Sequence, residues 1–294
     1  MKTRTKFIIY ILITGLLLFS DSLILAQETI TTEIKPLKLY VGLSAGPSIN
    51  KIKFDGISSI SGMTSTYKNS ISGSIDIGYM LSRNFGIISG LEYSSFNPEL
   101  FLGTYSNKFN TIDSDIPPEP YERRISGSDI HETQKITFMS LPLCLNIQIP
   151  LTKKFGIFIQ AGAYFSFPVS DEYSSRGTFS YSGYYPAYNV VLQNLPAYGF
   201  VNDAAVSFKG KLEIVSPVIS GIGVAGFQCF ITDKLQLALG ANYSRSLTNI
   251  SKSTSPETFQ LSWDSNQISS MMGGSRKTET ENLGLRLSVR YYFR

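Results

Sequence analysis

The amino-acid sequence predicts an all-β fold: a transmembrane, antiparallel up-and-down β-barrel of about eight strands, with short periplasmic turns and long extracellular loops. Three observations lead to this prediction. Apolar and polar residues alternate along the C-terminal stretch, the predicted connections alternate between long and short, and the N-terminus has the pattern of an export signal. An exported chain without apolar helices can span a membrane only as a closed barrel, because every backbone N–H and C=O group must be paired inside lipid.

The last stretch, residues 282–294, gives the clearest pattern. Its apolar residues alternate with mostly small or basic residues, which is the period of a β-strand with one apolar and one polar face. Strands of membrane barrels have this pattern because one face contacts lipid and the other faces the lumen. The apolar residues are Leu283, Leu285, Leu287, Val289, Tyr291 and Phe293.

Seven further stretches are predicted to be strands. Both faces of the sixth are apolar, so its inner and outer faces stay unassigned. Pro142 falls on the inner row of the fourth strand, where it removes one backbone donor and predicts a local defect. In chain order the seven are residues 37–48, 69–81, 85–96, 134–149, 155–168, a strand within 209–231, and 234–248.

The predicted connections alternate in length. Those after the first, third, fifth and seventh strands are long, at about 49–68, 97–133, 169–208 and 249–281. Those after the second, fourth and sixth are tight turns near residues 82–84, 150–154 and 232–234. Outer-membrane barrels alternate in this way, with short periplasmic turns and long extracellular loops.

The N-terminal segment is predicted to be a signal peptide. Lys2, Arg4 and Lys6 precede an apolar run at 7–19, and cleavage is expected after Ala26. The predicted organisation is therefore a signal peptide (1–26), a periplasmic segment (27–36) and an outer-membrane barrel (37–294). Cleavage would lower the net charge from +4 to about +2, too little to indicate a nucleic-acid partner.

A soluble eight-stranded barrel of the lipocalin kind is the structural alternative. Such a barrel would face its apolar residues inward, whereas the predicted inner rows here carry charged and amide side chains. Charged residues make up only 16% of the chain, below the roughly 25% of an average soluble protein. These features favour the membrane barrel. The polar inner residues are Asp76, Glu92, Gln160, Asn242, Arg286 and Arg290.

Four of these charges are predicted to lie in one layer of the lumen. Asp76 and Glu92 lie about equally far from the turn that joins their strands, and Arg286 and Arg290 lie near the C-terminal end. An eight-stranded barrel is only just wide enough for side chains, and an unpaired buried charge is costly. The sequence therefore predicts a luminal ion-pair network. The alternative is a gated or proton-conducting path.

His131 is the only histidine, and it lies where the second long connection enters the fourth strand. A barrel enzyme that acts on lipids could place a histidine and a serine there, and Ser126, Ser128 and Asp129 are close in sequence. Adjacent strand residues point to opposite faces, however, and no oxyanion donors can be named. A solvated histidine at the rim is the preferred interpretation.

The third long connection is rich in aromatic residues. They either pack on one another as a cap over the barrel mouth or form a surface for a partner or a ligand. The candidates for this surface are Tyr173, Tyr181, Tyr184, Tyr185 and Tyr188.

The sequence predicts neither a metal site nor a cofactor. One histidine and two distant cysteines fit no metal-ligand spacing. Export would permit a disulfide between Cys144 and Cys229, but Cys229 lies on the unassigned strand, so this pairing stays open.

Three stretches of the chain resemble the PorT-like outer-membrane β-barrel proteins common in Bacteroidetes. Residues 138–143 look like the family's strand with leucine or isoleucine, proline and leucine, and residues 156–165 resemble its next strand, rich in glycine and aromatic residues. Residues 284–293 resemble its closing strand. The resemblance implies a barrel in the outer membrane. One founding member is tied to protein secretion.

The sequence thus predicts a monomeric outer-membrane barrel that is not an enzyme. Its expected role is structural or accessory, through extracellular loops or lateral contacts. Its expected partners are outer-membrane lipids and envelope or secretion-machinery proteins. A lipid-modifying enzyme and a narrow channel are the alternatives.

Overall fold

The computed structural model describes residues 39–55, 62–115, 117–252, 261, 263–264 and 267–293. They belong to one compact unit, which spans Leu37–Arg294. The predicted signal peptide and periplasmic segment lie outside the described residues. In the described ranges, no helix has the length and apolar character needed to cross a membrane.

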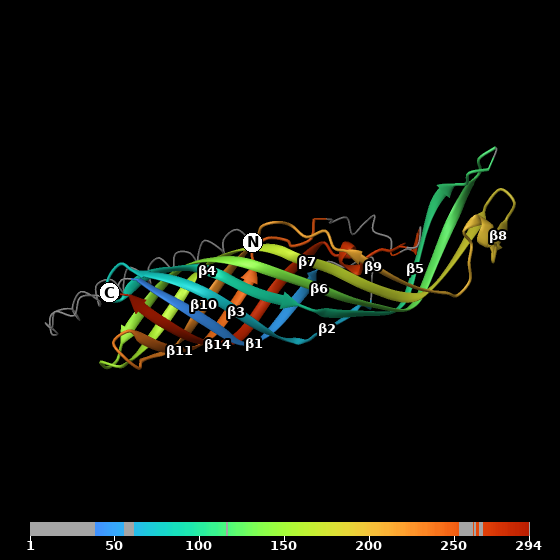
Figure 1. Ribbon diagram of the computed structural model, residues 1–294. Helices are drawn as coiled ribbons and strands as arrows, with labels where there is room; N and C mark the ends of the chain where they lie inside the picture. Colours follow the sequence, from blue (N-terminus) through green and yellow to red (C-terminus); the bar gives the residue numbers. More distant parts are fainter. Residues whose placement is uncertain are drawn as a thin grey trace. The chain divides into compact units, whose positions relative to one another are not determined.

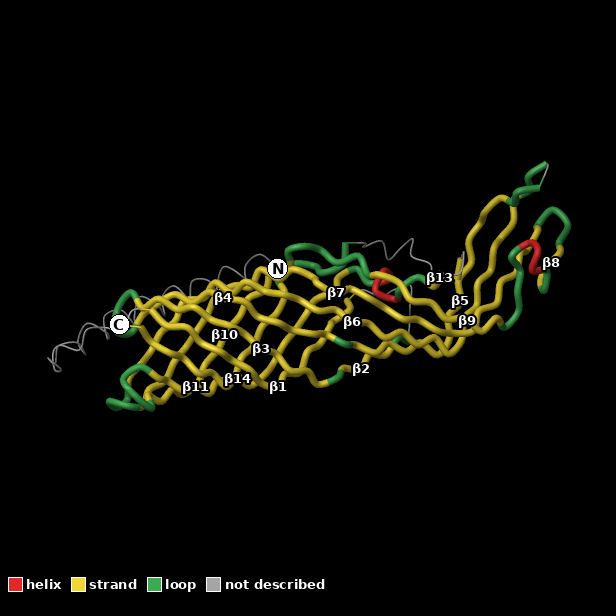
Figure 2. The backbone as a smooth tube through the Cα atoms, in the orientation of Figure 1, coloured by secondary structure: helices red, strands yellow, loops and turns green. Residues whose placement is uncertain are grey.

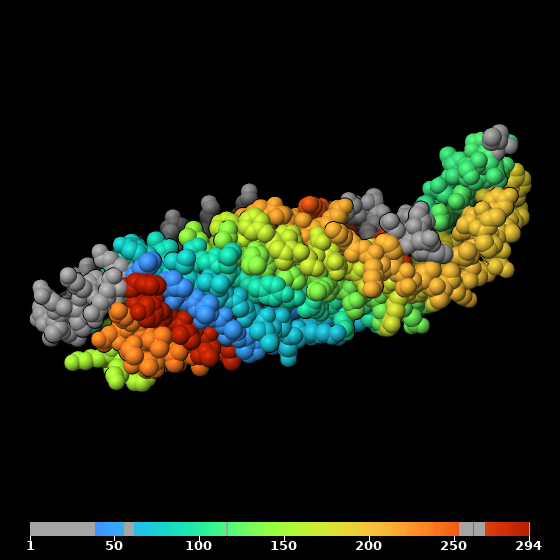
Figure 3. All heavy atoms as spheres, in the orientation of Figure 1, coloured from blue at the N-terminus to red at the C-terminus, as the bar shows by residue number. Residues whose placement is uncertain are grey.

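Eight long strands form a closed antiparallel ring (Figures 1 and 2). Each pairs with its neighbours in chain order, and the last pairs with the first, so the predicted up-and-down barrel is confirmed. Figure 3 shows the first and last strands, blue and red, side by side. The strands are β1 (Leu39–Asp55), β3 (Asn69–Met80), β4 (Phe85–Phe96), β6 (Pro120–Pro150), β7 (Phe155–Tyr185), β10 (Val218–Phe230), β11 (Leu235–Ser246) and β14 (Lys277–Phe293).

The predicted alternation of connections is also present. Three tight turns join β3 to β4, β6 to β7 and β10 to β11. In each turn a hydroxyl side chain accepts a hydrogen bond from the backbone N–H three residues later. Ser82 accepts from Phe85 at 3.1 Å, Thr152 from Phe155 at 3.0 Å, and Thr232 from Leu235 at 3.0 Å. The paired ends of β1 and β14, Leu39 and Phe293, lie at this short-turn end of the ring.

An apolar belt surrounds the ring near its short-turn end. Along each strand, outward side chains are mostly apolar and exposed while inward side chains are mostly buried, as the period of two requires. Leu143, in the middle of the β6 row, is 56% exposed. The belt, which we take as the membrane-spanning part, comprises residues 39–49, 71–79, 85–93, 139–149, 155–169, 219–229, 235–243 and 283–293.

Two of the predicted long loops are largely strands, and this corrects the sequence prediction. Segment 97–133 holds β5 (Pro98–Ile112) and the first part of β6, and segment 169–208 holds the second part of β7 with β8 (Val190–Gln193) and part of β9 (Ala204–Lys211). With β2 (Thr64–Tyr67), these strands form an extension sheet beyond the belt (Figure 1). We use this name for β2, β5, β8, β9, residues 120–135 of β6 and residues 170–185 of β7.

The sequence prediction treated these parts of β6 and β7 as loops because the extension sheet has no row of apolar residues that faces lipid. Its outward residues are mostly polar and most of its large apolar residues face inward, so the pattern that identified the barrel strands is largely reversed. The described part of the last long connection also forms secondary structure. It holds β12 (Trp263–Asp264), β13 (Gln267–Ile268), the 3-10 helix η2 (Met271–Gly274) and the start of β14.

Three hydrophobic clusters fill the interior. One lies within the belt around Tyr40 and Phe158, a second contains Ile136 and Phe138, and a third lies beneath the extension sheet around Ile130. Apolar residues from η2 and its flanking segment join the third cluster. The interior is therefore packed with apolar as well as polar side chains.

The predicted defect at Pro142 is present as an interruption of the β4–β6 ladder. Pairing is regular up to Ser89 opposite Leu143 and resumes at Glu92 opposite Ser140. Gly90 lies within this gap, and a Cβ atom there would meet the Ile75 carbonyl oxygen at 2.0 Å. Ile75 belongs to β3, so only glycine at this position allows β3 and β4 to approach so closely.

Candidate functional site

Glu92 and Arg286 face each other across the lumen. Arg286 Nη2 forms an ion pair with Glu92 Oε2. The Tyr164 hydroxyl donates a 2.5 Å hydrogen bond to the same carboxylate oxygen and accepts one from Arg286 at 3.1 Å. The three side chains come from β4, β14 and β7, so these contacts link three strands across the lumen.

Asp76 and Arg290 do not join this ion pair directly. Asp76 accepts a 2.9 Å hydrogen bond from Ser44. Arg290 donates to Gln236 at 3.2 Å, and its guanidinium lies 5.5 Å from the centre of the Tyr40 ring and 4.9 Å from that of Phe158. The structure thus brings two of the four predicted luminal charges into contact and surrounds the other two with neutral and aromatic partners.

Amide side chains complete the lower lumen. Gln148 links the Tyr292 hydroxyl, at 3.2 Å, to Gln228, at 3.3 Å, and Gln160 donates to Asn146 at 3.3 Å. A cavity above them, lined in part by Glu92 and Tyr164, measures about 20 Å³. That volume holds about one water molecule.

A buried carboxylate that the sequence did not single out holds η2 in the mouth of the barrel. Glu132, on β6, is fully buried and accepts four hydrogen bonds. Two come from the η2 region, from the Ser270 hydroxyl at 2.7 Å and the Met271 backbone N–H at 2.8 Å. Gln134 donates at 2.7 Å and Ser175 at 2.8 Å.

Burial raises the pKa of the Glu132 carboxyl above its ordinary value, although all four hydrogen bonds act in the opposite direction. In the sequence, the only sign that Glu132 is buried was its place on the inward row of an alternating stretch. The segment it holds lies 138 residues away, so the contact could not be read from local pattern.

His131 lies on the outward face of the extension sheet. Its ring packs against Phe101 with centroids 4.7 Å apart, and it pairs in register with Arg176 of β7. Among the described residues it has no hydrogen bond to a serine or an acid. The geometry thus gives His131 no partner for nucleophilic catalysis.

Cys144 and Cys229 are free thiols on opposite faces of the barrel wall. Cys144 is buried in the lumen, whereas Cys229 lies between the exposed Phe227 of β10 and Ile231, which follows that strand. This also assigns the faces of β10, whose even-numbered residues point inward. Within the described ranges, no group of three or more His, Cys, Asp or Glu could hold a metal ion.

The five predicted loop tyrosines separate into two groups. Tyr173, Tyr181 and Tyr185 are buried: Tyr173 donates a 2.7 Å hydrogen bond to the Ile268 carbonyl, and Tyr185 stacks on Tyr121. Tyr184 is half-buried beneath the Arg124 guanidinium. Tyr188 alone of the five is largely exposed, at 61%.

Exposed apolar residues gather around Tyr188 at the end of the extension sheet, on both faces of β8, because the adjacent Val190 and Val191 point to opposite sides. We call this group the tip patch, and Figure 1 shows β8, which carries part of it, at the end farthest from the ring. Its aliphatic members were missed because they lie in a segment read as a loop. A pair of adjacent valines was the signal that could have identified them. The tip patch comprises Tyr188, Val190, Val191, Leu195 and Tyr198.

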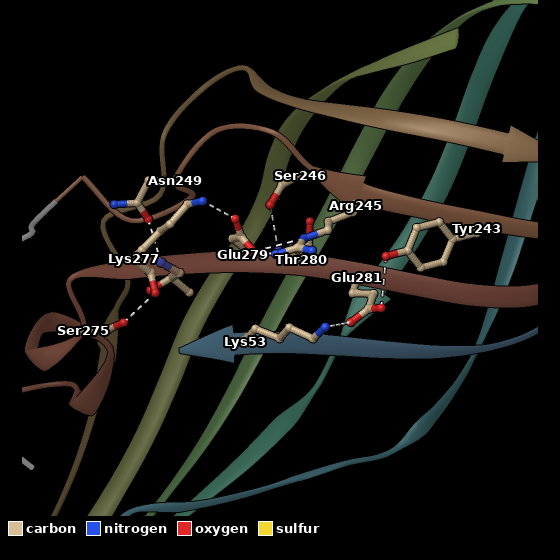
Figure 4. Close-up of polar contacts among 11 residues, drawn as sticks. Lys53, Tyr243, Arg245, Ser246, Asn249, Ser275, Lys277, Glu279, Thr280 and Glu281 are labelled. Carbon is tan, nitrogen blue, oxygen red and sulfur yellow. Dashed lines mark hydrogen bonds and ion pairs between the residues drawn. The ribbon is translucent and has the colours of Figure 1, made fainter. Parts of the chain in front are cut away.

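Charged side chains lie on β1, β11 and β14 just beyond the belt, and Figure 4 shows their contacts. Lys53 forms an ion pair with Glu281, and both Arg245 and Lys277 form ion pairs with Glu279. We call these five residues the paired girdle. Its charges are largely satisfied within the protein.

A family model described as outer membrane protein beta-barrel domain matches residues 25–252. The chain belongs to this family. It is therefore a β-barrel protein of the bacterial outer membrane, and its closed ring of eight strands fits that assignment. Comparison with curated proteins gives no match.

The chain is also similar to solved outer-membrane proteins at low sequence identity. OprG from Pseudomonas aeruginosa is 12% identical, with 87% of this chain and 96% of that chain covered and a TM-score of 0.41. Ail from Yersinia pestis is 11% identical, with 86% and 99% covered and a TM-score of 0.33. The outer membrane protease OmpT from Escherichia coli is 9% identical, with 90% and 99% covered and a TM-score of 0.34. These likenesses are too distant to bear on function.

Proposed function

We propose that this outer-membrane barrel is a non-enzymatic, non-conducting accessory protein that binds another envelope protein through the extension sheet. This proposal rests on the tip patch. Five large apolar residues are exposed within an eleven-residue segment, 188–198, far from the lipid-facing belt. Clustered apolar residues that are exposed to water mark interaction sites.

The packed interior supports a role outside the lumen. The Glu92–Arg286 ion pair crosses the lower barrel, and η2 is held in the mouth by Glu132. A conducting path would need both to be displaced. Single-channel recording in planar bilayers tests this point, since defined open states of the wild-type protein would contradict a non-conducting barrel.

The binding proposal is tested by crosslinking in intact outer membranes followed by capture of the tagged protein. The test variant carries Val190→Thr, Val191→Thr and Tyr198→Ser, and the control carries Gln193→Ala, a change at an exposed polar residue of the same strand. We expect a stoichiometric crosslinked protein with wild type and control and its loss with the test variant. A crosslink that the test variant retains in full would contradict the tip patch as the interface, and a crosslink to a second copy would show self-association instead.

We further propose that the protein belongs to the PorT-like branch and assists protein secretion. The strand around Pro142 and the closing strand support this finer assignment. Quantitative mass spectrometry of proteins released by a deletion strain tests it. An unchanged set of secreted proteins would argue against a secretion role and leave the binding proposal open.

We propose that residues 1–26 are removed on export. The basic segment, the apolar run and the small residue Ala26 support this cleavage. The intact mass of the protein extracted from outer membranes is expected to correspond to a chain that begins at Gln27.

A further inference from the structure

A groove of about 680 Å³ opens on the outward face of the extension sheet, between β2 and β9. Four lysines and two glutamates supply its charged side chains. The charged residues are Lys68, Lys135, Lys209, Lys211, Glu99 and Glu172. We call this site the basic groove.

Positive charge is in excess in the basic groove. Lys68 pairs with Glu99 at 2.5 Å. In the part of the chain that the structure describes, Lys135, Lys209 and Lys211 form no ion pair. Only Glu172 lies among these three lysines, between Lys135 and Lys211 in the strand register. The groove therefore presents three exposed ammonium groups against one carboxylate.

The basic groove lies directly beyond the apolar belt. On β6, Lys135 lies four positions before Met139, the exposed apolar residue at this edge of the belt, and on β7 Glu172 comes three positions after Val169. At about 3.3 Å per residue along a tilted strand, these side chains lie on the order of 10 Å beyond the hydrocarbon. Lipid headgroups occupy this layer, and the long lysine side chains can reach toward it.

The opposite side of the barrel provides an internal comparison. At a similar distance beyond the belt, each of the three cations of the paired girdle forms an ion pair with Glu279 or Glu281 (Figure 4). A general need for solubility would be met equally by paired charges on both sides. A groove of about 420 Å³ also opens at the paired girdle, lined in part by Lys53, Arg245 and Glu279. The basic groove therefore differs from it by the unpaired lysines Lys135, Lys209 and Lys211.

We propose that the basic groove binds the phosphate groups of an anionic lipid of the outer leaflet. Lys135, Lys209 and Lys211 would contact the phosphate oxygens, and the volume of the groove suits a phosphorylated headgroup. The acyl chains would then lie along the outward apolar residues of β6 and β7, below the groove. This inference does not depend on the tip patch or on its partner.

The test is native mass spectrometry of the full-length protein in detergent, titrated with diphosphorylated lipid A, with its fully dephosphorylated form, or with inorganic pyrophosphate. We expect saturable binding of the diphosphorylated lipid. Lys135→Gln/Lys209→Gln/Lys211→Gln should weaken that binding on the order of 100-fold at low salt, since each basic residue near an anionic lipid contributes about a fivefold change in affinity. Glu172→Gln, which removes the acid between two of the lysines, should strengthen it by a similar factor of about five.

The matched control is Lys108→Gln/Lys153→Gln/Lys154→Gln, which changes the charge equally at the far tip and in a periplasmic turn. It should bind as wild type does. Equal binding by both triple variants, equal binding of the dephosphorylated lipid, or no response to Glu172→Gln would overturn the proposal. Equally tight binding of inorganic pyrophosphate would show that the groove recognises a soluble anion, and would overturn the assignment to a lipid.

Discussion

Strands β6 and β7 each pass through two environments, and their side-chain pattern reverses between them. In the belt, β6 points Leu141, Leu143 and Leu145 outward and Ser140 and Asn146 inward. In the extension sheet the same strand points its polar residues outward and buries apolar ones. The β6–β7 ladder continues through both regions, with register shifts at Ser128/His131 and at Thr137/Phe138. The reversal follows the change of surroundings from lipid to water.

The comparison also shows that the two regions are stabilised differently. The extension sheet has a conventional hydrophobic core in which Ile125, Ile130 and Phe179 are almost fully buried. The belt encloses a mixed interior, where an ion pair and amide hydrogen bonds lie among aromatic side chains. Substitutions of the same kind should therefore have different effects in the two halves.

The largest expected effect comes from truncation in the core of the extension sheet. Phe179→Ala should destabilise the extension sheet by about 3–5 kcal/mol, because it leaves a cavity among well-packed side chains. Leu143→Ala, on the lipid face of the belt, leaves no internal cavity and should cost much less. Protease susceptibility of the extension sheet, followed in urea, measures the difference, and equal losses for both variants would contradict the separation into two regions.

A charge placed on the outward face should distinguish the two regions most directly. Leu143→Arg, in the middle of the belt, should destabilise folding into lipid vesicles by about 2–4 kcal/mol. Thr133→Arg, on the outward face of the same strand beyond the belt, should change the free energy of unfolding by less than about 0.5 kcal/mol. Equilibrium urea titration monitored by tyrosine fluorescence or circular dichroism measures both. Similar costs at the two positions would place the boundary of the membrane elsewhere.

The luminal ion pair should give a measurable coupling energy between Glu92 and Arg286 in a double-mutant cycle. Glu92→Ala and Arg286→Ala each leave a buried charge without its partner, so the double variant should lose less stability than the sum of the two single losses, by about 0.5–3 kcal/mol. Thermal unfolding of the three variants and wild type measures this coupling. Strictly additive losses would mean that the two residues stabilise the barrel independently.

Titration of Glu132 should make the stability of the barrel mouth depend modestly on pH. Because burial raises its pKa in the folded protein, the folded state binds this proton more tightly than the unfolded state. Stability should therefore increase as the pH falls through the raised pKa and decrease as the pH rises through it. Glu132→Gln lacks this titration, so the difference in stability between wild type and variant should change with pH. A difference that stays constant across the pH range would contradict the assignment.

The sequence by itself determined the barrel: its ring of eight strands, the direction of the belt residues and the alternation of connections. Lipid imposes an apolar row every second residue, and this pattern is local, so it can be read from stretches such as 283–293 without tertiary information. The predicted luminal charges also followed from the alternation, because residues opposite the apolar row must face inward.

Only the tertiary structure decided which side chains meet and how the long connections fold. Glu92 meets Arg286 while Arg290 instead contacts Gln236 and aromatic rings, and this choice depends on the shear of the closed barrel. The extension sheet was hidden because water imposes no lipid-facing row on its strands. The contact of Glu132 with η2 and the lysines of the basic groove each join segments far apart in the chain, and such proximity is set by strand register rather than by local pattern.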